Sequence, residues 1–319
     1  MAKPLNYATE YQKSLEQAFP YALYYGALYK TPNNGRFKWL NGKTIEIPSI
    51  SVTGRVDSTR DTIATAARNY DNSWTPLTLE NERKWSTLVH PADVQETNHV
   101  ATITNITRVF NEEQKFPEMD AYTISKIYAD WTAAGETADT TVLTAENILD
   151  VYDKMLEEMS EGRVPKMGLI LYVNPATNTL IKHAQGIYRT LDVGRQNNLS
   201  RAIKSLDEVQ IEEVPSELMK TLYDFTQGWK VAVSAKQINM MLINPLAVIT
   251  PVSYEFSKLD PPSALSEGKY VYYEESHEDV FVLKNKKKAM PADWTHPPAV
   301  LRFPLPPAHG QFRAPVPGW

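Results

Sequence analysis

Cysteine is absent from the 319 residues of this chain. Disulfide bonds, thiolate metal sites and cysteine nucleophiles are therefore excluded, and stability has to come from packing and association. The sequence also lacks an apolar signal core after Met1 and any run of the roughly 18 apolar residues that a membrane-spanning helix needs. We therefore expect a soluble protein that is made in the cytoplasm.

A basic excess is missing as well. The net charge is −5 and the isoelectric point is near 5.8, which argues against a dedicated nucleic-acid binder. No phosphate-binding loop, nucleophile elbow or dinucleotide fingerprint is present, and the nine-residue spacing of His90 and His99 suits no metal site. The sequence therefore predicts no catalytic, metal-binding or cofactor-binding residue.

Tyrosine is abundant in the first 35 residues, which hold six of them. Aromatic side chains at this density seldom stay in water, and tyrosine favours interfaces. Two interpretations fit residues 1–35 equally well: an arm that covers the core of its own chain, or one that packs on a neighbouring subunit. In the second, the candidate contact residues are Tyr21, Tyr24 and Tyr25.

Residues 36–89 show a hydrophobic period of two. Ile45 and Ile47 alternate with polar residues, and Trp85, Thr87 and Val89 alternate again at the far end. This pattern predicts a long β-hairpin with a polar, charged tip. Because an isolated hairpin is only marginally stable in water, we expect it to lie on a partner surface. The candidate contact residues at the tip are Arg55, Asp57, Arg60, Asp61 and Arg68.

Helical patterns follow the hairpin. Asp93 and Glu96 form a capping-box pattern, and a one-sided apolar stripe runs on to Phe110. We expect a break near Pro117, which suits the first position of a second helix. A third, amphipathic helix is expected after Thr144 and ends at Gly162.

The pattern of the chain after Gly162 predicts mainly strands, so the sequence as a whole predicts an α+β fold. The predicted strands are residues 167–173, 209–214, 229–233, 238–249, 270–273 and 280–283. The acidic run from Glu274 to Asp279 is interpreted as a solvated segment rather than a cation site. The basic cluster from Lys284 to Lys288 fits a solvated strand end, a contact with DNA or a neighbour's acidic loop.

Proline dominates the C-terminal part, with eight prolines between Pro291 and Trp319. Such a segment has no apolar periodicity and favours an extended conformation. It fits an arm laid over a neighbour, a flexible tail or an addition foreign to the rest of the fold.

Several motifs occur in an order that resembles the Hong Kong 97-type major capsid proteins of tailed bacteriophages. Each motif alone is weak, and their collinear order from Tyr7 to Lys288 makes the match specific. The matching segments are Lys43-Thr-Ile-Glu-Ile-Pro48, Val94-Gln-Glu-Thr97, Phe116-Pro-Glu-Met-Asp-Ala-Tyr122, Val164-Pro165, Leu169-Ile-Leu-Tyr-Val-Asn-Pro175, Glu213-Val-Pro215, Ile238-Asn-Met-Met-Leu-Ile-Asn-Pro245 and Glu278-Asp-Val-Phe-Val-Leu283.

The resemblance implies the parts of that capsid fold. These are an N-terminal arm at 1–35, an extended loop formed by a long β-hairpin at 36–89, a spine helix and peripheral lobe at 90–143, an axial α/β lobe at 144–250, return strands of the peripheral lobe at 251–290 and a proline-rich arm or tail at 291–319.

It also implies a non-enzymatic shell subunit that forms pentamers and hexamers around double-stranded DNA. The expected partners are further copies of the chain, a portal protein, a decoration protein, packaged DNA without sequence-specific binding and a separate scaffolding protein, since no fused scaffolding segment is recognised. The expected location is the virion capsid, assembled in the host cytoplasm. The alternatives are an encapsulin-like compartment around protein cargo and an unrelated hydrolase or binding protein.

Overall fold

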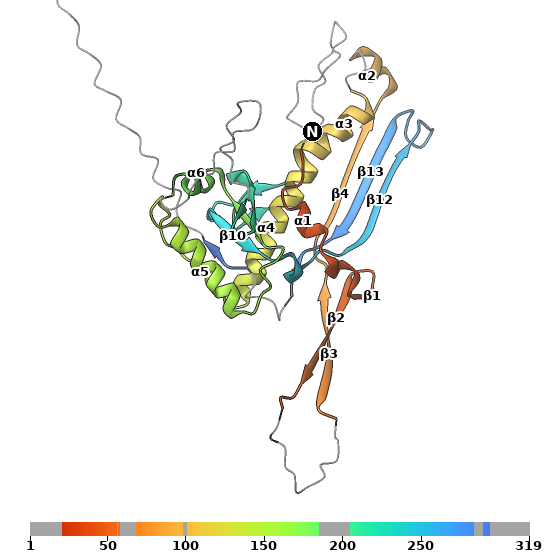
Figure 1. The fold of residues 1–319 in the computed structure, drawn as a ribbon. Coiled ribbons are helices and arrows are strands. Elements are labelled where there is room, and N and C mark those ends of the chain that lie inside the picture. Colours follow the sequence, from red (N-terminus) through yellow and green to blue (C-terminus); the bar gives the residue numbers. More distant parts are fainter. Residues whose placement is uncertain are drawn as a thin grey trace, which may run out of the picture.

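A computed structural model describes residues 21–55, 57, 68–97, 101–184, 205–283 and 290–293. One long helix separates a compact mixed lobe from a three-stranded sheet, and a two-stranded hairpin projects away from both (Figure 1). The N-terminal segment crosses the helix near its middle through α1 (Gly26–Tyr29) and the 3-10 turn η1 (Pro32–Gly35).

The mixed lobe contains the larger core. Its sheet has the strand order β15-β10-β5-β7-β6, in which β5 and β7 are parallel and the other pairs are antiparallel. The central strands β5 (Ile170–Val173) and β10 (Met240–Ile243) are buried on both faces. The other strands of this sheet are β6 (Ser205–Leu206), β7 (Val209–Glu213) and β15 (Ala292–Asp293).

Two helices pack on this sheet, α5 (Ile148–Glu161) and α6 (Pro175–His183). The buried side chains of α5 recur at helical spacing, and Gly162 ends the helix as the sequence predicts. Asn174 begins α6 by accepting a 2.7 Å hydrogen bond from the Thr177 amide. The lobe also holds the short elements η3 (Ser216–Leu218), β8 (Tyr223–Asp224), β9 (Lys230–Val231) and η4 (Pro245–Ala247).

The long helix is continuous through Pro117. It consists of α3 (Ile103–Phe110), a π-helical stretch η2 (Asn111–Lys115) and α4 (Phe116–Ala133), about 46 Å in all at 1.5 Å per residue. The predicted break near Pro117 is therefore wrong. The π-helical stretch widens the turn before Pro117, where the ring would otherwise clash with the preceding turn and where an amide donor is lost.

The hairpin is formed by β2 (Thr44–Val52) and β3 (Tyr70–Thr78), which pair antiparallel from Thr44–Thr78 to Val52–Tyr70, with β1 (Lys38–Asn41) beside β2. The prediction that residues 85–89 return the hairpin is wrong. Those residues lie in β4 (Glu82–Val89), which belongs to another sheet with the strand order β12-β13-β4. The alternation in 85–89 identified a strand, but a period of two does not specify the strand's partner.

The three-stranded sheet is completed by β12 (Val252–Asp260) and β13 (Tyr270–Glu278). The acidic residues Glu274 to Glu278 lie within β13, not in a solvated segment, and Asp279 is buried. Near the sheet, α2 (Pro91–Glu96) is capped by the His90 side chain rather than by the predicted Asp93. The short strands β11 (Val248–Ile249) and β14 (Phe281–Val282) pair beneath the hairpin base.

Candidate functional site

The hairpin has two chemically different faces. Directly paired residues share a face, so Ile50, Val52, Tyr70 and Trp74 lie together on the distal part. All four are exposed, Ile50 by 71% and Val52 by 73%. The opposite face is polar at this level, where the hydroxyls of Ser49 and Ser73 lie 2.7 Å apart. We call Ile50, Val52, Tyr70 and Trp74 the distal apolar face.

The base of the hairpin is held by a small core of its own. Ile45 and Leu79 pack with Ile249 and Phe281, and the Leu79 amide donates a 2.7 Å hydrogen bond to the Lys43 carbonyl oxygen. Ile45 lies on the face opposite the distal apolar face, because positions 45 and 50 differ by an odd number along the strand. The face that anchors the hairpin base is therefore opposite the face that carries the exposed apolar side chains.

The tip of the hairpin carries charges of both signs. Arg55, Asp57 and Arg68 lie there and are exposed, and the Arg68 guanidinium lies 5.9 Å from the centre of the Tyr70 ring. Arg60 and Asp61 fall outside the residues that the structure describes. Among the described residues these three side chains form no ion pair, and their role as contact residues between subunits stays a prediction.

Residues 117–122 of the long helix join the surrounding parts of the fold. Glu118 pairs with Arg83 of β4 at 2.5 Å, and Arg83 also donates to the Phe225 carbonyl oxygen at 2.8 Å. Asp120 accepts hydrogen bonds from the Tyr21 hydroxyl at 2.5 Å and from two backbone amides of the N-terminal segment. We call residues 117–122 the helix junction.

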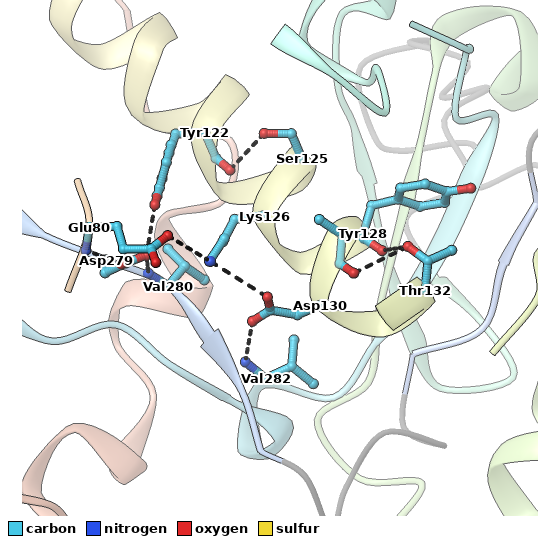
Figure 2. Close-up of polar contacts among 11 residues, drawn as sticks. Glu80, Tyr122, Ser125, Lys126, Tyr128, Asp130, Thr132, Asp279, Val280 and Val282 are labelled. Carbon is cyan, nitrogen blue, oxygen red and sulfur yellow. Dashed lines mark hydrogen bonds and ion pairs between the residues drawn. The ribbon is translucent and has the colours of Figure 1, made fainter. Parts of the chain in front are cut away.

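Tyr122 extends the helix junction to the hairpin base. Its hydroxyl donates a 2.8 Å hydrogen bond to Asp279, whose other carboxylate oxygen accepts from the Glu80 amide at 2.8 Å (Figure 2). One helical turn further, Lys126 lies 3.9 Å from Glu80 and 3.6 Å from Asp130. One stretch of helix therefore fixes both the hairpin base and the three-stranded sheet.

Burial of the junction carboxyls changes their protonation. Asp120 is fully buried, and this burial raises the pKa of its carboxyl to about 6, against the effect of its hydrogen bonds. Burial also raises the pKa of Glu278 to about 7, although Lys115 lowers it. The pKa of the Tyr122 phenol is raised by burial and by Asp279. Burial thus makes the ionised form of each of these groups less favourable than it is in water.

The tyrosines of the N-terminal segment meet their own chain. Tyr25 is fully buried against Tyr172, with ring centres 4.8 Å apart. Its predicted role as a contact between subunits is therefore wrong in this structure, and it is a core residue. Tyr21 and Tyr24 are half-buried on the same cluster, and a role for them between subunits stays a prediction. Residues 1–20 lie outside the described chain.

The contacts of the helix junction are not predicted from the sequence. Asp120 and Tyr122 lie inside a matched motif that names no partner for them, and the sequence pattern predicts Asp279 in a solvated segment, which is wrong. The available signal was the position of Asp279 between a strand and the apolar Val280, where an acidic side chain needs buried partners.

No metal-binding or membrane-spanning feature emerges from the described residues. They contain no cluster of three or more histidine, aspartate or glutamate side chains that could hold a metal ion. None of the helices in the described ranges combines the length and apolar character that a bilayer crossing requires.

Comparison with solved structures identifies the fold. A chain from Mycobacterium phage Che8 is 14% identical, with a TM-score of 0.62 over 90% of this chain and 97% of that one. The mature capsid of bacteriophage PhiM1 gives 10% identity and a TM-score of 0.64 over 91% and 92%. The capsid of cyanophage P-SCSP1u gives 10% identity and a TM-score of 0.66 over 90% and 92%.

These likenesses cover almost the whole chain. The protein therefore has the α+β, Hong Kong 97-type fold of phage capsid subunits, as the resemblance implied. No protein-family model matches the sequence. No curated protein matches it either.

Proposed function

We propose that this protein is the major capsid protein of a tailed bacteriophage, and that its copies form pentamers and hexamers of an icosahedral-type shell around double-stranded DNA. The observation that carries the proposal is the distal apolar face, presented on a hairpin that projects from a capsid-type fold. A surface of this kind is stabilised when a partner covers it.

Repetition makes such a contact effective. In closed symmetry each interface recurs in every subunit, so modest free energies per contact add up to a stable shell. Arg55, Asp57 and Arg68 carry charges of both signs at the hairpin tip. Such charges favour one orientation of the tip on a partner surface and add little to the binding free energy. The function lies in these interfaces, and the proposal assigns no catalytic step to the chain.

Within the proposed subunit, residues 1–35 form the arm, 90–143 include the spine helix and 144–250 form the axial lobe. The extended loop proposed at 36–89 has its paired strands at 44–52 and 70–78, and residues 82–89 lie in the three-stranded sheet. Residues 251–290 return to the peripheral lobe, and 291–319 form an arm or tail whose first residues lie in β15 of the mixed lobe. The proposed partners are further copies, a separate scaffolding protein, a portal protein, a decoration protein and DNA held without sequence specificity. The proposed location is the virion capsid, after assembly in the host cytoplasm.

Electron microscopy of the expressed chain, alone and with its genomic neighbours, tests the proposal. We expect closed shells built from pentamers and hexamers, and nucleic acid inside shells made during infection. Shells that enclose protein cargo instead would favour the encapsulin-like alternative. A monomer on light scattering over a wide concentration range, with no particles, would contradict the proposal.

A further inference from the structure

A groove of about 460 Å³ lies between the inner face of the three-stranded sheet and the π-helical part of the long helix. Its wall is aromatic: Trp85 stacks on Phe110 with ring centres 3.9 Å apart, and Tyr272 lies beside Trp85. We call it the sheet–helix groove. None of the contacts proposed above uses it.

The sheet–helix groove has an excess of negative charge. Five carboxylates and three cations line it. Glu118 pairs with Arg83, and Glu274 pairs with Lys115 at 3.3 Å. Glu255 and Glu278 form no ion pair within the described part of the chain, and Glu278 is half-buried. An occupant that carries positive charge would relieve this excess.

The C-terminal segment has the complementary chemistry. Residues 294–319 contain seven prolines, Arg302 and Arg313, and no acidic side chain. Proline-rich segments favour the polyproline II conformation, which aromatic grooves recognise at low entropic cost. An arginine guanidinium suits both a carboxylate and an aromatic face.

The length of this segment is sufficient. The described chain ends at Asp293 in β15, at the edge of the sheet of the mixed lobe. The 26 residues that follow reach about 80 Å in a polyproline II conformation. This exceeds the length of about 46 Å of the long helix, which contacts the mixed lobe and forms one wall of the groove.

We propose that residues 294–319 of this chain dock in the sheet–helix groove, with prolines against Trp85, Phe110 and Tyr272, and arginines facing Glu255 and Glu278. The hairpin tip of a neighbour is a poorer match, because its arginines are accompanied by Asp57 and Asp61. The docked segment would fasten the three-stranded sheet to the mixed lobe of its own or an adjacent subunit.

The absence of cysteine makes a disulfide test clean. Ser257 lines the groove and is exposed, so Ser257→Cys is combined with Ala308→Cys in the full-length chain. The matched control pairs Ala308→Cys with Ser86→Cys, an exposed serine on the outer face of the same sheet. Under mild oxidation we expect about tenfold more disulfide with Ser257→Cys, because docking raises the effective concentration of the two thiols.

Exchanging charges between the groove and the C-terminal segment tests whether carboxylates recognise the arginines. Glu255→Lys in the Ser257→Cys, Ala308→Cys background should reduce the disulfide yield, and adding Arg302→Glu and Arg313→Glu should restore part of it. Mixing chains with one cysteine each shows whether the segment comes from the same or an adjacent subunit, and either result supports docking.

The measurement is made on unassembled subunits and on particles, so it does not depend on whether shells form. Equal disulfide yields at positions 257 and 86, or no disulfide at 257 in either preparation, would overturn the proposal. So would an unchanged yield in the Glu255→Lys variant. In that case another segment or partner occupies the groove.

Discussion

The Tyr122 hydroxyl donates a 2.8 Å hydrogen bond to the buried carboxylate of Asp279, which joins the long helix to the end of β13. The two residues are 157 positions apart in the sequence. Asp279 also accepts from the Glu80 and Val280 amides. A single side-chain contact thus links the helix, the hairpin base and the three-stranded sheet (Figure 2).

Removal of the Tyr122 hydroxyl should weaken this joint. We expect Tyr122→Phe to lower the free energy of unfolding by about 1–3 kcal/mol, because Asp279 stays buried and loses a donor. Tyr128→Phe is the matched control, since Tyr128 lies on the same helix and its hydroxyl has no described hydrogen bond. Urea denaturation of both variants measures the difference, and equal losses would contradict the assigned role.

Asp120 should make the subunit more stable in mild acid. Its folded-state pKa of about 6 exceeds the unfolded value of 3.8, so the folded state binds more protons between these values. The contribution is fully present below about 4 and is lost as the pH rises through about 6. The difference in pKa corresponds to at most about 3 kcal/mol.

Urea denaturation across this pH window checks the sign. We expect the free energy of unfolding of the native chain to fall as the pH rises, and the Asp120→Asn variant to show a smaller fall. Glu278 changes stability in the same direction through its pKa of about 7. The free energy of unfolding of the Asp120→Asn variant should therefore still depend on pH, but less strongly. A native chain that gains stability between about 4 and 6 would contradict the burial argument.

The distal apolar face should be needed for assembly but not for folding. Ile50→Ser with Trp74→Ser removes two exposed apolar side chains, so the thermal midpoint should hardly change. Burial of each in an interface contributes about 1.5–3 kcal/mol, so the particle yield should fall by more than about tenfold. Electron microscopy and sedimentation measure the yield.

Ser49→Ala with Ser73→Ala is the control for that experiment, because both serines lie on the polar face at the same level of the hairpin. This variant should assemble nearly normally. Equal yields from the two double variants would show that the apolar face is not an interface.

Charge at the hairpin tip should also matter. Arg55→Glu with Arg60→Glu should impair assembly and leave the subunit folded, because both arginines belong to the polar tip and Arg55 is exposed. Arg55→Lys with Arg60→Lys keeps the charges and should assemble. Normal particles from the charge-reversed variant would count heavily against the role assigned to the hairpin.

Local patterns predicted most elements of the fold. The apolar run before Asn174-Pro175 became β5, and the amphipathic stretch that ends at Gly162 became α5. One strand, β12, was missed although Val252, Tyr254 and Phe256 alternate with polar residues. Both faces of β12 are largely exposed, so its alternation does not mark a boundary between core and solvent.

The sequence by itself determined the exclusion of thiol chemistry, the α+β composition and the existence of a long hairpin with a polar tip. These depend on residue types and on periods within short windows. Only the tertiary structure decided that β4 pairs with β13, that Tyr25 belongs to the core and that Asp120 and Asp279 are buried acceptors. Such facts depend on which distant segments meet, because the cost of burying a polar group is set by partners far away in the chain.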